Sequence, residues 1–516
     1  MLSINDLNTD VILHVLTFLT DKNKLNFMMT CSHLYQFVSC VKYNNFQLFD
    51  KICGLSFRKN FKKIIYFKKI DECNNKNTVF ILESNRDKIP LGTTCIKTGY
   101  HFNFLEIGVI PEGIISLELC EYFDHTLKKG HIPKTVTRLI INNGFRHMEK
   151  GSIPNSVTHL IFGEEFNKVI DAGVIPKSVV YLKFGWYFNQ SIKNIIPPNV
   201  KYLSLKYPFD QPISEEIYIG DTLRTVSYIP ESVKYFDYEA LNDKFDFKIL
   251  PENITHLNLK IEKHIHPGNI PRSITHLGLL NSEYISPGVI PDNVTHLSFD
   301  LYYFSNYSLN QLIHKNITHL NLGDLSVSCD RIPNSVTHLT YNPKYLTKKS
   351  IPNSVTHLTI HNKIKGSINE CIPNSVVYLN FNGTYNTTIY KGDIPNNVKC
   401  LIFGNQFNQY IEEDAIPDSV VRLTFGKSYN KPINNIIPIN VKNLTFGFQF
   451  NQSIENAIPN CVSHLEFGYM FNQSLKNSIP DSVTHLIFSY GPKSIYKIKK
   501  NFINNIPKTV SVILFR

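Results

Sequence analysis

The sequence repeats one short phrase along most of its length. At residue 153 it reads Ile-Pro-Asn-Ser-Val-Thr-His-Leu-Ile-Phe, and at residue 479 it reads Ile-Pro-Asp-Ser-Val-Thr-His-Leu-Ile-Phe. A fixed period of this kind decides the architecture, because units that are too small to fold alone must stack on one another. The repeat therefore predicts a solenoid over residues 89–516.

The proline of the phrase marks where each unit starts. Nineteen prolines, together with His314 in the same slot, give 20 starts that are mostly 19–23 residues apart. Two gaps are longer, 33 residues after Pro197 and 27 residues after Pro480. Because a full extra unit would add about 21 residues, both gaps predict loop insertions. The first is an acidic bulge at 213–229, and the second is a basic loop at 493–500.

Each unit has the pattern of a short strand followed by a turn. In the unit that starts at Pro154, Leu160 and Phe162 alternate with other residues, so both side chains should face the core from one strand. Gly163 predicts an exit from the strand with positive φ. Asn167 is suited to hydrogen-bonding the backbone of a turn. The expected core residues of this unit are Val157, Leu160, Phe162 and Phe166.

The units resemble two known repeats. The spacing Val-x-x-Leu-x-Phe is similar to the strand segment of a leucine-rich repeat. More closely, the units resemble the FNIP repeat family of amoebae and of the large DNA viruses that infect them. The residues that carry this likeness, besides the recurring Ile-Pro, are Gly185 with Phe188-Asn189-Gln190, Gly404 with Phe407-Asn408-Gln409, Gly447 with Phe450-Asn451-Gln452, and Gly468 with Phe471-Asn472-Gln473. The resemblance implies a long leucine-rich-repeat-like β-solenoid of about 20 units of ~21 residues.

Residues 1–45 do not follow the repeat. Apolar residues recur at helical spacing between Val11 and Leu19, again around Leu25, and again from Leu34 to Val41, which predicts three short helices. Three such helices bury little apolar surface among themselves. Their remaining apolar surface therefore predicts either a docking partner or a cap on the solenoid.

This N-terminal stretch resembles an F-box. The matching residues are Leu7, Asp10, Ile12, Leu13, Val15, Leu16, Phe18, Leu19, Leu25, Phe27, Met28, Cys31, His33 and Leu34. Asn8 stands where the family usually has proline. The resemblance implies a small all-α head whose helices dock into the apolar groove of a Skp-type adaptor of a cullin–RING ubiquitin ligase. The adaptor-binding residues that it implies are Leu7, Ile12, Val15, Leu16, Leu19, Leu25 and Met28.

Residues 46–88 form a connector that is rich in lysine and aromatic residues. Lys62 and Lys63 follow Phe61, and Lys68 and Lys69 follow Phe67. Interleaved basic and aromatic residues are one signature of nucleic-acid binding. The alternative, which we prefer, is a helix or strand that packs its apolar side on the first repeat and leaves its lysines in water. The net charge of +11 is mild for this length, so we expect no nucleic-acid partner.

The fifth residue after each proline points away from the core and forms a stripe down the stack. The stripe contains Tyr181, Tyr202, Tyr235, His256, His276, His296, His319, His338, His357 and Tyr378. Neighbouring rings should lie ~4.8 Å apart, the spacing of adjacent strands. We consider three interpretations: a structural ladder of neutral imidazoles, a partner-binding face rich in aromatic rings, and a metal site. A straight row fits the tetrahedral geometry of zinc poorly.

No sequence motif of catalysis stands out from the repeat background. There is no Gly-rich phosphate loop, nucleophile elbow or His-Glu-x-x-His pattern, and the ten cysteines lack metal or disulfide spacing. No apolar stretch approaches the 18 residues of a membrane span. We therefore expect a cytoplasmic protein, in the host cytoplasm if viral, that is not an enzyme and needs no metal or cofactor. It is either a substrate receptor of a ubiquitin ligase or a plain repeat scaffold.

Overall fold

A computed structural model describes most of the repeat region. It covers residues 43–48, 61–66, 79–489, 506–510 and 512–515, except for gaps at 91, 100–101, 103, 121–124, 143, 207–208, 240–244, 262–263, 281–284, 301–308, 324–331, 344–345, 349 and 362–367. Contacts divide the chain into two units, described separately here. Unit 1 contains Met1–Asn75 and Ser367–Arg516, and unit 2 contains Lys76–Gly366. The helices expected between Val11 and Val41 lie outside the described residues, and the last three residues of the all-α head predicted over 1–45 belong to a strand, β1 (Tyr43–Leu48), instead.

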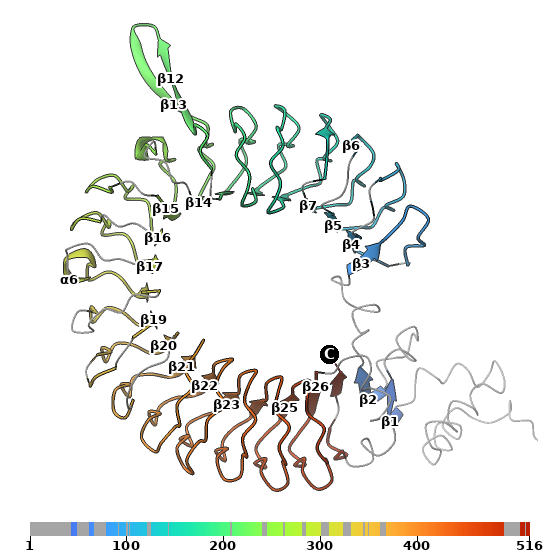
Figure 1. The fold of residues 1–516 in the computed structure, drawn as a ribbon, viewed down its shortest axis with the longest axis vertical. Coiled ribbons are helices and arrows are strands. Elements are labelled where there is room, and N and C mark those ends of the chain that lie inside the picture. The colour runs from blue at the N-terminus through green and yellow to red at the C-terminus, as the bar shows by residue number, and fades with distance from the viewer. Residues whose placement is uncertain are drawn as a thin grey trace, which may run out of the picture. The chain divides into compact units, whose positions relative to one another are not determined.

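Unit 2 is built on one parallel sheet with a single strand from each coil. Its strands, in spatial and chain order, are β3 (Val79–Leu82), β4 (Cys95–Thr98), β5 (Ser116–Leu119), β7 (Arg138–Ile141), β9 (His159–Phe162), β10 (Tyr181–Lys183), β11 (Tyr202–Leu205), β14 (Tyr235–Glu239), β15 (His256–Lys260), β16 (His276–Leu280), β17 (His296–Asp300), β18 (His319–Asn321), β19 (His338–Tyr341) and β20 (His357–Ile360). In Figure 1 these strands line the inner side of the unit, and the turns lie outside.

Unit 1 repeats the same arrangement. Its strands from the repeats are β21 (Tyr378–Phe381), β22 (Cys400–Phe403), β23 (Arg422–Thr424), β24 (Asn443–Thr445), β25 (His464–Phe467), β26 (His485–Phe488) and β27 (Val512–Phe515). Each pairs in parallel with the next, and equivalent positions face each other, as Leu444 faces Leu465. Throughout the described chain, a strand starts five residues after each unit marker, which confirms the predicted repeat architecture.

The core follows the predicted pattern. Val157, Leu160, Phe162 and Phe166 are fully buried, and their equivalents in neighbouring coils stack on them. The rings of Phe162 and Phe184 lie 5.2 Å apart with an interplanar angle of 11°. Each coil therefore buries its apolar side chains mainly against the coils before and after it, which is why the fold needs many units.

The glycine after the strand has a different role from the predicted one. Gly163 and Gly185 are not among the positive-φ residues, so the prediction for Gly163 is wrong. A Cβ on Gly185 would lie 1.8 Å from the backbone oxygen of Gly163 in the preceding coil. The same collision recurs where Gly447 approaches Gly426. Glycine is required here because consecutive coils touch backbone to backbone.

Positive φ falls instead three residues before the proline. Gly151 (φ 83°) and Gly173 (φ 83°) occupy this position, and Asn194 (φ 62°) and Asn477 (φ 56°) occupy it in other coils. These residue types tolerate the left-handed conformation best. The corner before each Ile-Pro is therefore the tight turn of the coil.

Asparagine ladders hold the outer turns together, as predicted for Asn167. Its Oδ1 accepts hydrogen bonds from the backbone N of Asn189 (3.0 Å) and from Nε2 of Gln190 (2.9 Å) in the next coil. Asn451 makes the same bonds to Asn472 and Gln473. Each asparagine thereby satisfies a turn N–H that the parallel sheet cannot reach.

The insertion at 213–229 forms a β-hairpin, which confirms the predicted bulge. Strands β12 (Ser214–Ile219) and β13 (Thr222–Ser227) pair antiparallel around Gly220 (φ 63°). Figure 1 shows this hairpin projecting from unit 2. The remaining elements are β6 (Thr126–Leu127) paired with β8 (His147–Met148), the 3-10 helix η5 (Phe247–Ile249) and the helix α6 (Leu309–Leu312). The basic loop expected at 493–500 lies outside the described residues.

The connector contributes strands at two places, and one of them is the expected first repeat. Strands β1 (Tyr43–Leu48) and β2 (Phe61–Tyr66) pair in parallel, and β2 pairs with β27, the last strand of the chain, rather than with the first repeat. The edge of β27 offers unpaired N–H and C=O groups after the final coil, and β2 satisfies them. Strand β3 also lies within the connector, and it pairs in register with β4, the strand of the first repeat, as expected.

Candidate functional site

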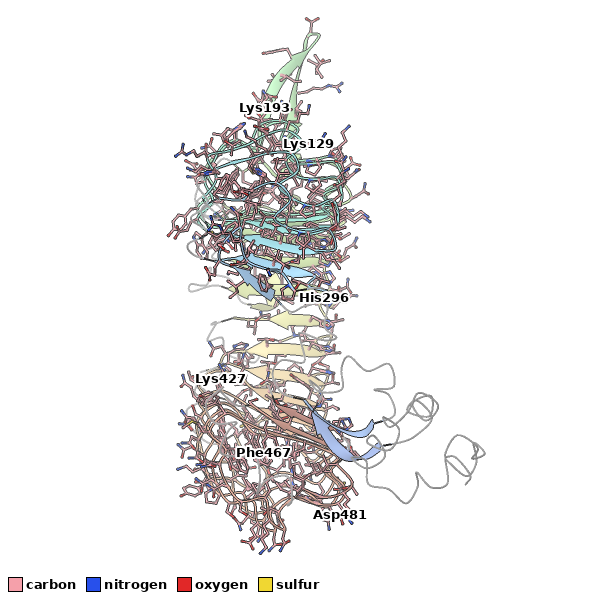
Figure 2. All side chains as sticks on the ribbon, turned by 90° about the vertical axis from the view of Figure 1, so that its right-hand side faces the viewer. Lys129, Lys193, His296, Lys427, Phe467 and Asp481 are labelled. Carbon is pink, nitrogen blue, oxygen red and sulfur yellow. The ribbon has the colours of Figure 1, made fainter. Side chains whose placement is uncertain are left out.

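Six consecutive strands of unit 2 carry a continuous stack of imidazole rings. His256, His276, His296, His319, His338 and His357 each begin a strand and face one another in register. The centroids of neighbouring rings lie 3.9–4.1 Å apart, and the planes differ by 13–18°. Figure 2 labels His296, the third of the six. We call these six residues the imidazole ladder.

A tyrosine stack continues the ladder on one side. Tyr235 stands 4.1 Å from His256, and Tyr181 and Tyr202 stack at 4.2 Å with an angle of 8°. Tyr378, the last member of the predicted stripe, begins β21 in unit 1. The other nine predicted residues belong to one sheet face of unit 2.

A threonine before each histidine fixes its ring. The Oγ1 of Thr275 lies 2.9 Å from Nδ1 of His276, and the equivalent distance is 2.9 Å for Thr295 and His296. All six ladder histidines make this contact at 2.9–3.0 Å. The bond holds the ring planes nearly parallel, so the geometry expected of the structural interpretation is present.

The ladder environment favours the neutral imidazole. Burial holds the pKa below its ordinary value of 6.5 for five rings, and the positive charge that neighbouring rings would carry lowers the pKa further. The five residues are His256, His276, His296, His319 and His338. Two protonated rings about 4 Å apart would repel each other strongly in this half-buried setting.

Five rings of the ladder, all but His357, line a groove of about 390 Å³ on the sheet face. Tyr202 and Tyr235 lie at one end, and small side chains such as Gly278 and Ser298 line it beside the rings. The alternating pattern of the strand creates the groove: the bulky ring stands at the first strand position, and the outward residue two positions later is short. The groove therefore runs across the strands, parallel to the ladder.

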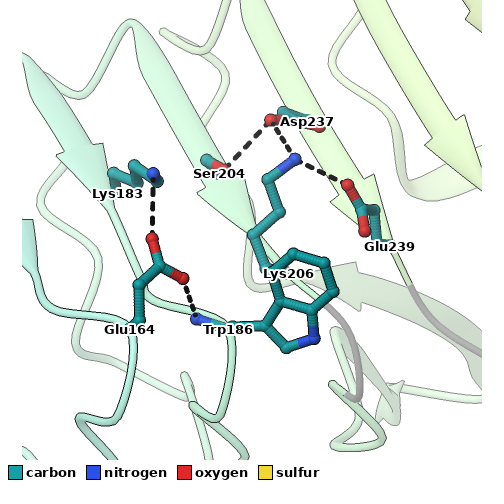
Figure 3. A network of polar contacts seen from close by, with 7 residues as sticks. All are labelled: Glu164, Lys183, Trp186, Ser204, Lys206, Asp237 and Glu239. Atoms are coloured by element: carbon teal, nitrogen blue, oxygen red, sulfur yellow. Dashed lines mark hydrogen bonds and ion pairs between the residues drawn. The ribbon is translucent and has the colours of Figure 1, made fainter.

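A charged network borders the groove, and the sequence interpretation missed it (Figure 3). The Nζ of Lys206 lies 2.9 Å from Oδ2 of Asp237 and 2.6 Å from Oε1 of Glu239, and Ser204 Oγ donates to Asp237 Oδ2 at 3.2 Å. Burial opposes the charge on Lys206, but the hydrogen bonds to Glu239 and Asp237 outweigh it and raise the pKa of the ammonium. The sequence did contain a signal for this network, because Lys206 and Glu239 carry opposite charges at equivalent outward positions of consecutive repeats.

No metal site is evident in the part of the chain that the structure describes. Within it, no group of three or more histidine, cysteine, aspartate or glutamate side chains could hold a metal ion. Five of the cysteines are described, and all are free thiols. The same residues include no helix that is long and apolar enough to cross a membrane.

Acid should destabilise unit 2 through the ladder. The folded-state pKa of five imidazoles lies below 6.5, so the unfolded chain binds more protons as the pH falls through this value. Stability is then present above about pH 6.5 and is lost below it. We expect the melting temperature at pH 5 to be lower than at pH 8 by about 5 °C or more. Equal melting temperatures at the two pH values would contradict this.

Fold and repeat pattern define a parallel β-solenoid. The FNIP Repeat family matches residues 103–144, 146–187, 188–222, 262–302, 341–384, 385–428, 429–470 and 450–491, and the F-box domain family matches residues 4–45. Together these spans cover more than half of the chain. The chain belongs to the F-box and FNIP repeat-containing proteins.

Relatives come from a giant virus of amoebae. An F-box and FNIP repeat-containing protein of Acanthamoeba polyphaga mimivirus is 82% identical over 516 residues, which is 100% of both chains. A FNIP repeat-containing protein of the same virus is 32% identical over 240 residues, covering 44% of this chain and 51% of the relative. A crystal structure described as a novel circular LRR protein aligns with 29% identity and a TM-score of 0.46, covering 89% of this chain and 66% of that chain.

Proposed function

We propose that this protein is a substrate-recognition adaptor. The F-box would bind a Skp-type adaptor of a cullin–RING ubiquitin ligase, and the solenoid would bind a protein target. An F-box followed by a repeat solenoid is the composition of a protein-interaction adaptor, and none of the matched families is catalytic. The adaptor would act by proximity, since it raises the effective concentration of the target at the ligase.

One observation carries the proposal. The F-box match ends at residue 45, and β1 (Tyr43–Leu48) overlaps that end and belongs, through β2 and β27, to the sheet of unit 1. No separate linker divides the F-box sequence from this strand. An adaptor built in this way would hold the ligase at a defined position relative to the last coils of the repeat. A flexible tether would leave that position undefined.

The aromatic stripe of unit 2 is the proposed target-binding face. It combines Tyr202, Tyr235 and the imidazole ladder on one sheet face beside a groove, and rigid aromatic rings supply contact area at low entropic cost. We place the protein in the cytoplasm, in the host cytoplasm if it is viral, with no membrane partner and no nucleic-acid partner. The second candidate function is a repeat scaffold without a ligase link, since the helices could merely cap a solenoid.

A pull-down with a purified Skp-type adaptor tests the ligase link. We expect the full chain to be retained and Leu16→Asp and Leu19→Asp each to reduce retention by about tenfold or more, because a carboxylate cannot enter an apolar groove. Equal melting curves of the three proteins would show that the solenoid is intact. If the unaltered chain is not retained, the scaffold function is correct.

A further inference from the structure

The hydrogen-bond network assigns the tautomer of the ladder. The backbone oxygen of Thr255 accepts from the N of Thr275 (2.9 Å) and from the N of His276 (3.1 Å), which uses both of its lone pairs. The hydroxyl of Thr275 lies 3.3 Å from that oxygen but only 2.9 Å from Nδ1 of His276. From the shorter contact we infer that the hydroxyl hydrogen goes to Nδ1 rather than to the carbonyl, which places the ring proton on Nε2.

The same arrangement recurs along the stack, so the ladder presents a row of N–H donors. His296, His319 and His338 have the same threonine contact and the same doubly used carbonyl in the preceding coil. None of the residues that the structure describes hydrogen-bonds to Nε2 of these rings, of His256 or of His276. Their ring faces cover one another, so the N–H edges are what the ladder offers to a ligand.

We propose that the groove beside the imidazole ladder binds an extended, carboxylate-rich peptide segment of a protein target. This deepens the proposed function, on which it rests, by naming the chemistry of the target. Neighbouring ring centroids lie 3.9 Å apart, so two Nε2–H donors can share the two oxygens of one carboxylate. The ladder has five spacings of this size, roughly 20 Å, the length of about six residues of extended chain.

Peptide is favoured over nucleic acid by the charges that surround the groove. Binding of a phosphate backbone rests on lysine and arginine charges, whereas the residues that line the groove include no lysine or arginine. Asp237 lines the groove, and Glu239 lies beside it. Their single charged neighbour in the network, Lys206, is already engaged by both carboxylates.

Binding of an acidic segment should strengthen as the pH falls. A carboxylate beside the ladder favours the protonated ring, so ligand and protons are taken up together. The titratable and charged groups near the rings are Tyr202, Tyr235 and Asp237 in the groove and Lys206 and Glu239 beside it. The phenol pKa of Tyr202 is raised by burial, which leaves the imidazoles as the groups that change charge between pH 8 and pH 6.

Fluorescence anisotropy with the full-length chain tests the proposal. The probe is a labelled peptide of six glutamates, with a six-glutamine peptide and a 20-nucleotide oligothymidylate as comparisons. The variant His276→Phe/His296→Phe/His319→Phe keeps stacked rings but removes three N–H donors. The matched control is His464→Phe/His485→Phe, because this unit 1 pair stacks at 4.2 Å with the same hydroxyl contact.

We expect the unaltered chain to bind the glutamate peptide about tenfold tighter at pH 6 than at pH 8. The triple variant should bind this peptide at least about tenfold more weakly than the unaltered chain, and the control variant should bind it within about twofold of the unaltered chain. Equal binding by the triple variant, equal binding of the glutamine peptide, or no dependence on pH would overturn the proposal. Tighter binding of the oligonucleotide would assign the groove to nucleic acid instead. Retention of the triple variant by the Skp-type adaptor would show that the ligase link is intact even if the groove does not bind the acidic peptide. The two failures can therefore be distinguished.

Discussion

Replacing Gly185 with alanine is expected to destabilise unit 2 by about 3 kcal/mol, at the upper end of the usual range for single substitutions. The new Cβ would lie 1.8 Å from the backbone oxygen of Gly163 and 2.6 Å from the Cα of Glu164. Backbone atoms cannot rotate away as a side chain can, so the two coils must separate. Because stability of a solenoid depends on the interfaces between neighbours, separation weakens the adjacent coils as well. Urea unfolding followed by circular dichroism measures the effect.

Gly163→Ala is the matched control in the adjacent coil. There the nearest atom to the new Cβ is Oδ1 of the Asn142 side chain, at 1.9 Å, and that amide can move at the cost of its hydrogen bond to the Leu119 oxygen. We expect a loss of about 1 kcal/mol. If the two variants unfold at the same urea concentration, the close backbone approach is not what requires glycine at Gly185.

Lys206→Met is expected to destabilise unit 2 by about 3 kcal/mol. Methionine keeps much of the apolar stem but removes the ammonium that neutralises Asp237 and Glu239, whose side chains are 13% and 10% exposed. Removing one partner of a buried ion pair leaves uncompensated charge, which costs more than the pair itself contributes. The combined variant Lys206→Met/Asp237→Asn/Glu239→Gln should recover most of the loss, because no charge is then left without a partner.

Lys183→Met serves as the control on the neighbouring strand. Its ammonium lies 3.5 Å from a Glu164 carboxylate that is 60% exposed, and such pairs contribute about 0–1 kcal/mol. Thermal melts of the four proteins at pH 7 provide the comparison. A loss for Lys206→Met no larger than that for Lys183→Met would show that the network is solvated rather than buried.

Predictions from the repeat were accurate wherever one residue type performs the same task in every coil. The alternation of Leu160 and Phe162 fixed the buried face, and the recurrence of asparagine at Asn167 fixed the ladder of turns. Position five of each unit placed the imidazoles in one row. Burial and repetition constrain these positions in every unit alike, so a single sequence contains many copies of the same evidence.

Other features depend on which strands pair with each other. A repeat pattern does not contain this information. The partner of β2 is β27, although more than 400 residues of sequence separate them. The association of Lys206 with Asp237 and Glu239 crosses the insertion of the hairpin, and it required the register of β11 against β14. The collision at Gly185 required the spacing between coils, which a pattern of residue types does not contain.

The sequence by itself determined the period, the strand positions, the core and the face that carries the histidines, because these follow from local spacing repeated many times. Only the tertiary structure decided how the sheet of unit 1 ends and why glycine follows the strand in coils such as those of Gly185 and Gly447. The physical reason is that both depend on contacts between backbone atoms of different coils, which the local spacing of residue types does not specify.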